Sequence, residues 1–182
     1  MKVIFCAYRE WATNVIDSLP KYYDYIELDD TSDIHKRIIE YKPDVIFFIG
    51  WSSIIPEDIV NNYLCLCIHP SRLPKYRGGS PIQNQIIDGL TSSAVTLFKM
   101  NNKIDAGDIV GQETISLSGD LEEILERITE ASITLIVKTL VKINLGIKLD
   151  LIQQEESVAT YCKRRKPSDS EITIEDLENK TA

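Results

Sequence analysis

Glycine-rich phosphate-binding motifs are absent from this sequence of 182 residues, which has eight glycines, four cysteines and two histidines. The first strand-like segment runs into Ala-Tyr-Arg-Glu-Trp-Ala at positions 7–12, where a dinucleotide-binding fold would need glycines close to the pyrophosphate. The sequence therefore argues against a nicotinamide dehydrogenase, and it has no P-loop motif. The sparse cysteines and histidines predict free thiols in a reducing compartment and no metal site.

Long apolar runs and an excess of basic residues are also missing. No segment approaches the roughly 20 apolar residues that cross a bilayer, and the apolar N-terminal run is interrupted at Arg9 and Glu10 without a signal-peptide cleavage site. The formal net charge is −8, the opposite sign to that of a surface that wraps nucleic acid. Residues 163–166 (Lys-Arg-Arg-Lys) are a local basic stretch. It is either a solvated segment at the edge of the domain or a basic patch of the kind that contacts phosphate backbones. We expect a cytoplasmic protein without a membrane partner, acting on a small molecule rather than on nucleic acid.

Short apolar segments alternate with amphipathic helical segments in the first half of the chain. Segments 44–50 and 64–69 are apolar on both faces, which is typical of strands buried in a parallel sheet. The pattern predicts a doubly wound α/β fold, with a mostly parallel, twisted sheet and helices on both faces. The expected strands are 2–8, 25–28, 44–50, 64–69, 94–100 and 109–115, and the expected helices are 11–19, 32–41, 56–61, 81–88 and a long one ending near Gly146.

The length of the chain fits one domain with a substantial core. We expect residues 1–167 to form this domain. The remaining residues, 168–182, are polar and acidic, and we expect them to form a C-terminal tail.

Two loops carry side chains suited to acid–base chemistry. Ligands of open α/β sheets bind beyond the carboxyl ends of the strands. His69 lies at such an end, with Cys67 on the same face because side chains alternate along a strand. The loop 103–108 carries Asp105, whose carboxylate would fix the tautomer of His69 and stabilise its charged form if the loops meet. Taken alone, His69 also fits a structural role, and Asp105 fits a solvated turn.

Four segments of the chain resemble the 10-formyltetrahydrofolate-dependent formyltransferases, in the same order. Residues 69–78 (His-Pro-Ser-Arg-Leu-Pro-Lys-Tyr-Arg-Gly) are similar to the family's His-x-Ser-Leu-Leu-Pro-x-x-Arg-Gly. Residues 94–97 and 104–110 resemble its Gly-Val-Thr-x and Asp-x-Gly-x-Ile segments, and 159–171 resemble the stretch that closes its N-terminal catalytic domain. The resemblance implies a Rossmann-like formyltransferase fold and an enzyme that transfers a formyl group from 10-formyltetrahydrofolate to a primary amine.

The resemblance also implies a reactive set, Asn-x-His plus an aspartate. The histidine corresponds to His69 and the aspartate to Asp105, but Cys67 stands where the family has asparagine. An asparagine N–H would stabilise the developing oxyanion; a thiol is a weak donor, and losing one such donor typically lowers the rate about 100- to 1,000-fold. A working variant, a slow enzyme, a folate-binding protein with little activity and covalent catalysis by the Cys67 thiolate all remain open.

The family's ligand sites map onto two further parts of the chain. The residues implied for folate are Trp51, Ile54, Ile55, Ile104 and Asp105. The loop after His69 has cations and glycine amides that could bind substrate phosphates or could merely shape the site wall; they are Lys75, Arg77, Gly78 and Gly79.

Three formyl acceptors fit the resemblance. An amino-deoxy sugar linked to a nucleotide is our choice, because residues 50–52 (Gly-Trp-Ser) and the Arg-Gly-x-x-Pro pattern at 77–81 resemble the sugar N-formyltransferases. Methionyl-tRNA and glycinamide ribonucleotide are the alternatives. Because sugar enzymes of this family dimerise, a homodimer is possible.

Overall fold

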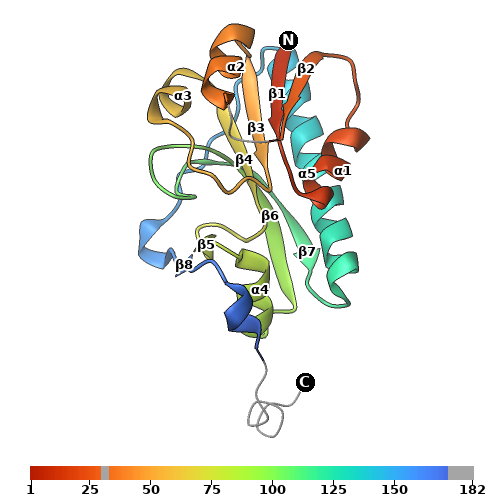
Figure 1. Ribbon diagram of the computed structural model, residues 1–182, viewed down its shortest axis with the longest axis vertical. Coiled ribbons are helices and arrows are strands. Elements are labelled where there is room, and N and C mark those ends of the chain that lie inside the picture. The colour runs from red at the N-terminus through yellow and green to blue at the C-terminus, as the bar shows by residue number, and fades with distance from the viewer. Residues whose placement is uncertain (30–32, 172–182) are drawn as a thin grey trace, which may run out of the picture.

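The computed structural model describes residues 1–29 and 33–171, and a six-stranded sheet forms its centre (Figure 1). The strand order is β2-β1-β3-β4-β6-β7. The first four strands are parallel, whereas β6 and β7 are antiparallel to their neighbours. The strand bounds are β1 (Lys2–Cys6), β2 (Asp24–Leu28), β3 (Val45–Ile49), β4 (Cys65–His69), β6 (Ser92–Lys99) and β7 (Ile109–Ser116). A small second sheet pairs β5 (Arg77–Gly78) with β8 (Tyr161–Cys162).

Helices cover both faces of the large sheet (Figure 1). On one face lie α1 (Glu10–Ser18) and the long α5 (Leu121–Asn144), and on the other lie α2 (Ile34–Tyr41) and α3 (Glu57–Asn62). The short α4 (Pro81–Ile87) follows β5, and single 3-10 turns occupy Glu156–Val158 and Pro167–Ser170. No helix in the described part of the chain is long and apolar enough to span a membrane.

Strand β3 shows why the sequence is apolar on both faces of the sheet. Its five residues are all buried; Val45, Phe47 and Ile49 face the α1/α5 side, and Ile46 and Phe48 face the α2/α3 side. Burial of each such side chain contributes about 1.5–3 kcal/mol. The predicted mostly parallel sheet between two helical layers is confirmed.

The six strands and five helices predicted from the sequence are found in the predicted order, with ends that differ by one or two positions. The short strands β5 and β8 and the two 3-10 turns were not predicted. The start predicted for the second helix, Ser32, lies outside the described residues. Part of the predicted tail, residues 168–170, belongs to the last 3-10 turn, and 172–182 also lie outside the described residues. The long helix α5 begins at a capping box, in which Asp120 and Glu123 each accept a hydrogen bond from the other's backbone N–H.

Candidate active site

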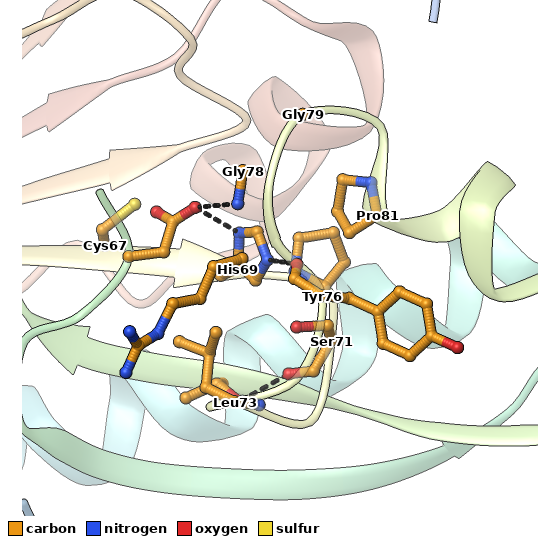
Figure 2. Close-up of polar contacts among 12 residues, drawn as sticks. Cys67, His69, Ser71, Leu73, Tyr76, Gly78, Gly79 and Pro81 are labelled. Atoms are coloured by element: carbon orange, nitrogen blue, oxygen red, sulfur yellow. Dashed lines mark hydrogen bonds and ion pairs between the residues drawn. The ribbon is translucent and has the colours of Figure 1, made fainter. Parts of the chain in front are cut away.

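His69 is the last residue of β4 and is almost completely buried, with 6% of its surface exposed. Its Nε2–H donates a 2.8 Å hydrogen bond to the carbonyl oxygen of Tyr76, and Nδ1 lies 3.6 Å from Oδ2 of Asp105 (Figure 2). A neutral imidazole carries one proton, and the bond to Tyr76 places it on Nε2. Nδ1 is therefore the basic nitrogen, and it faces the carboxylate.

Asp105 is held by backbone contacts on the loop between β6 and β7. The Gly78 N–H donates a 2.7 Å hydrogen bond to Oδ2 of Asp105. The aspartate has a φ of +48°, in the left-handed region that non-glycine residues seldom adopt. Two residues on, a Cβ at Gly107 would lie 1.7 Å from the carbonyl oxygen of Lys99, so only glycine lets this loop fold back on β6. The two predicted loops therefore meet; the catalytic role of their side chains stays a prediction.

A cavity of about 390 Å³ opens beside Asp105, on the α2/α3 side of β4. Binding sites for small molecules typically measure about 300–1,000 Å³ and are mainly apolar. Two isoleucines in the wall, Ile54 and Ile104, are 93% and 64% exposed and add apolar surface that a ligand can cover. The structure brings all the predicted folate-site residues into this wall: Trp51, Ile54, Ile55, Ile104 and Asp105.

Cys67 also lies in the cavity wall, two residues before His69. Burial raises the pKa of its thiol well above the usual value, and the nearby Asp105 carboxylate raises it further. The group is therefore a neutral thiol near neutral pH, and a thiol is a much poorer nucleophile than a thiolate. This environment argues against the covalent alternative for Cys67.

The structure contradicts the prediction that Arg77 binds a substrate phosphate. Arg77 is completely buried, and its guanidinium donates to Oε1 of Gln154, to both carboxylate oxygens of Glu156 and to the hydroxyl of Tyr161. Burial by itself would lower the pKa of Arg77, but the hydrogen bonds to Glu156 and Tyr161 outweigh it and raise the pKa. Arg77 thus ties the C-terminal segment to the loop after His69.

The other predicted phosphate donors are divided between two places. Gly78 and Gly79 line the cavity, but their amides donate inside the chain, to Asp105 and to the carbonyl of Cys162. Lys75 is exposed and lines a separate hollow of about 510 Å³, together with Lys163. The loop therefore shapes the wall of the site, and Lys75 is the member with an exposed cation.

Gln154, which was not predicted from the sequence, contacts the loop that carries Asp105. Its Nε2 donates to the carbonyl oxygens of Asp105 at 2.9 Å and of Gly107 at 2.7 Å, while its Oε1 accepts from Arg77. Only 7% of Gln154 is exposed. Gln154 is one of two consecutive glutamines in a polar stretch that follows no pattern, so only its buried partners reveal it.

Together these features define a class of site. An imidazole–carboxylate pair at the wall of an apolar cavity, in a doubly wound α/β domain, is suited to moving a proton between bound reactants away from bulk water.

The chain belongs to the formyl transferase family, because a sequence model of that family matches residues 21–140. It is similar to methionyl-tRNA formyltransferases. That of Syntrophomonas wolfei is 35% identical over 159 residues, or 81% of this chain and 50% of the relative. That of Lachnospira eligens is 38% identical over 129 residues, which are 68% of this chain and 40% of the relative. The chain spans half or less of the length of these relatives.

Solved structures resemble the chain over most of its length. The methionyl-tRNA formyltransferase from Clostridium thermocellum superposes with a TM-score of 0.84 and 30% identity, covering 98% of this chain and 79% of its own. HypX from Aquifex aeolicus in complex with tetrahydrofolic acid has a TM-score of 0.79 at 22% identity, and the match covers 91% of this chain and 30% of HypX. PseJ from Anoxybacillus kamchatkensis has a TM-score of 0.73 at 24% identity, and the match covers 90% of this chain and 86% of PseJ. The last two show likeness of fold, and the family resemblance read from the sequence is confirmed.

Proposed function

We propose that the chain transfers a formyl group from 10-formyltetrahydrofolate to a primary amine. The observation that carries the proposal is the 3.6 Å approach of His69 Nδ1 to the carboxylate of Asp105, in the wall of an apolar cavity. Membership of the formyl transferase family supports the reaction class. When bound, the folate supplies the formyl carbon that the amine attacks.

The cavity suits a folate in shape and charge. Aromatic and aliphatic side chains in its wall can pack on a flat pterin ring, among them Phe48, Trp51 and Ile55. Lys103 and Arg164 add positive charge to the same wall, which complements the carboxylates of a glutamate tail.

The task of the imidazole–carboxylate pair is to remove the proton that the attacking amine must lose. Asp105 forms part of the cavity wall, and His69 is buried next to it. The carboxylate therefore receives the proton and His69 Nδ1 shares it. The pair then returns it to the nitrogen of tetrahydrofolate that departs as its bond to the formyl carbon breaks. Because the Tyr76 carbonyl and the Gly78 amide already hold the two groups, they need little rearrangement during the reaction.

Cys67 sets how well negative charge on the formyl oxygen is stabilised. Its neutral thiol is in the cavity wall, where the family has an amide. A thiol is a weaker donor than an amide N–H. We therefore expect a functional site whose rate of formyl transfer is lower than that of a site with asparagine at position 67.

Methionyl-tRNA is the first acceptor to test, since curated relatives with that activity in their name share 34–38% identity with the chain. This changes the order expected from the sequence, where an amino-sugar nucleotide came first. The sugar nucleotide remains the second candidate; PseJ, which has the same fold, is described in complex with a UDP-linked formamido sugar and tetrahydrofolate. Both acceptors carry phosphate, and the basic stretch 163–166 is suited to it through Lys163, which lines the separate hollow together with Lys75.

An acceptor panel tests the proposal. The full chain is incubated with 10-formyltetrahydrofolate and, separately, methionyl-tRNA, glycinamide ribonucleotide or nucleotide-linked 3-amino and 4-amino sugars, and release of tetrahydrofolate is followed by absorbance. Turnover with one acceptor that His69→Ala abolishes supports the proposal and identifies the amine. Saturable folate binding without turnover on any acceptor would instead identify a folate-binding protein.

A further inference from the structure

Three consecutive residues, Tyr76, Arg77 and Gly78, hold both members of the proposed catalytic pair. The Tyr76 carbonyl fixes the ring of His69, and the Gly78 amide fixes the carboxylate of Asp105. Figure 2 shows Tyr76 and Gly78 on either side of the His69 ring. The residue between them, Arg77, has its side chain buried and directed toward the C-terminal segment.

Gln154 completes this arrangement from the C-terminal segment. Its carbonyl oxygen accepts two hydrogen bonds from Arg77, at 3.1 and 2.9 Å, and its amide nitrogen donates to the backbone carbonyls of Asp105 and Gly107. Asp105 is thus held at its carboxylate by Gly78 and at its carbonyl by Gln154. Residue 154 also lies beyond the segment 21–140 that the family model matches.

The chemistry of the contact requires a side-chain amide. One group must accept from a guanidinium and donate to two carbonyl oxygens while carrying no charge, and glutamine is long enough to do so here. Without these donors, the buried carbonyl of Gly107 and the partly buried carbonyl of Asp105 lose their hydrogen bonds to Gln154. The left-handed backbone of Asp105, at a φ of +48°, would then be free to relax.

We propose that Gln154 is a positioning residue that sets the separation between the Asp105 carboxylate and His69 Nδ1, and thereby the rate of the proposed formyl transfer. Gln154 does not line the cavity that we assign to folate. Its effect is therefore on the geometry of the pair and not on folate binding.

Two substitutions in the full chain separate positioning from folding. Gln154→Glu keeps oxygen acceptors for Arg77 but presents a carboxylate to the two backbone carbonyls, and Gln154→Leu removes both sets of bonds. We expect kcat to fall about 10- to 100-fold in each, because displacement of a reacting group by about 1 Å has effects of this size. The folate Kd should stay within about threefold of wild type.

Glu156→Gln is the matched control. It changes another partner of Arg77, a carboxylate that is 66% exposed, and leaves the bonds to Gln154 and Tyr161 intact. We expect kcat within about threefold of wild type. A loss equal to that of Gln154→Glu would overturn the positioning role, since anchoring of Arg77 in general would then be what matters.

A second measurement does not depend on turnover. The chain has two histidines, His35 and His69, so their ring proton signals in an NMR spectrum can be assigned with His69→Ala. Gln154→Glu should move the His69 signal and leave that of His35, and Glu156→Gln should move neither. An unmoved His69 signal, an unchanged kcat, or a parallel loss of kcat and folate affinity would each overturn the proposal. If the wild-type chain transfers no formyl group, the proposed function fails, while the His69 signal still tests the positioning.

Discussion

His69 Nδ1 and Asp105 Oδ2 lie 3.6 Å apart, each in a side chain that is anchored by the backbone of the same short segment. The separation is longer than a hydrogen bond of about 2.7–3.2 Å, as catalytic contacts often are before reactants bind. Once a proton has been taken up, a small movement of either side chain would let Nδ1 and Oδ2 share it.

Removal of either member of this pair should abolish most transfer. Asp105→Asn keeps an oxygen that can accept from Gly78 but loses the basic carboxylate, and His69→Ala removes Nδ1. We expect kcat to fall about 100- to 10,000-fold in both, because general acid–base catalysis contributes this much. Steady-state release of tetrahydrofolate measures kcat. For His69→Ala, whose side chain does not line the cavity, calorimetry should show a folate Kd within about threefold of wild type. A normal rate in either variant would remove that residue from the mechanism.

Restoring the amide at position 67 should not slow the enzyme. Cys67→Asn places an N–H donor in the cavity wall next to Asp105, and we expect a rate between unchanged and about 100-fold higher. Cys67→Ala is the control, expected within about threefold of wild type because a neutral thiol contributes little. A large loss of activity in both variants would show that the thiol has a role of its own.

The Cys67 thiol should react slowly with iodoacetamide at about pH 8, where a free cysteine with a pKa near 8.5 reacts readily. Its pKa is raised, so at any pH below it the thiolate fraction is smaller than in a free cysteine, and the rate should rise with pH.

Asp105→Asn removes a charge that raises this pKa, so it should speed alkylation of Cys67. Cys65, whose pKa burial raises to about 12 with no contribution from Asp105, should be unaffected. Peptide mass spectrometry after timed alkylation distinguishes the two thiols; equal rates in wild type and variant would contradict the assigned cause.

A charge at the cavity mouth should weaken folate binding without changing catalysis. Ile104→Glu replaces an isoleucine that is 64% exposed in the cavity wall, and we expect the folate Kd to rise about tenfold or more, with kcat at saturation retained. Ile87→Glu is matched in residue type and exposure, at 61%, but lies on α4 outside the cavity wall. Calorimetric titration with folate should show no effect there. Equal Kd values in the two variants would place the folate elsewhere.

A methyl group at Gly107 should strain the loop that carries Asp105. The added Cβ would overlap the Lys99 carbonyl oxygen, so we expect Gly107→Ala to lower the free energy of unfolding by about 1–3 kcal/mol or more. At Gly146, φ is +66° but no atom lies within 4 Å of an added Cβ, so Gly146→Ala should lower it by about 1–2 kcal/mol through backbone strain alone. Urea unfolding monitored by circular dichroism gives both values. A smaller effect at Gly107 than at Gly146 would contradict the steric argument.

The fold and the pair of loops were predictable because their signals are local. Strands such as β3 are short apolar runs, and the sheet they form follows from burial on both faces. His69 and Asp105 stood out because acid–base side chains at strand ends are few in this chain. The antiparallel half of the sheet, β6 and β7, was predicted as two strands, but nothing in its sequence specified how the loop between them folds back over β4.

The sequence by itself determined the α/β class and the two loops that carry His69 and Asp105, since burial and chain reversal depend on neighbouring residues. The tertiary structure decided that these loops meet and that the predicted apolar residues line one cavity. Only the tertiary structure decided what Arg77 and Gln154 do. A cation in a glycine-rich loop has the same sequence signature whether it binds phosphate or a buried glutamine. The partners that distinguish these outcomes, Gln154 and Glu156, lie 77 and 79 positions further along the chain and are brought to Arg77 only by folding.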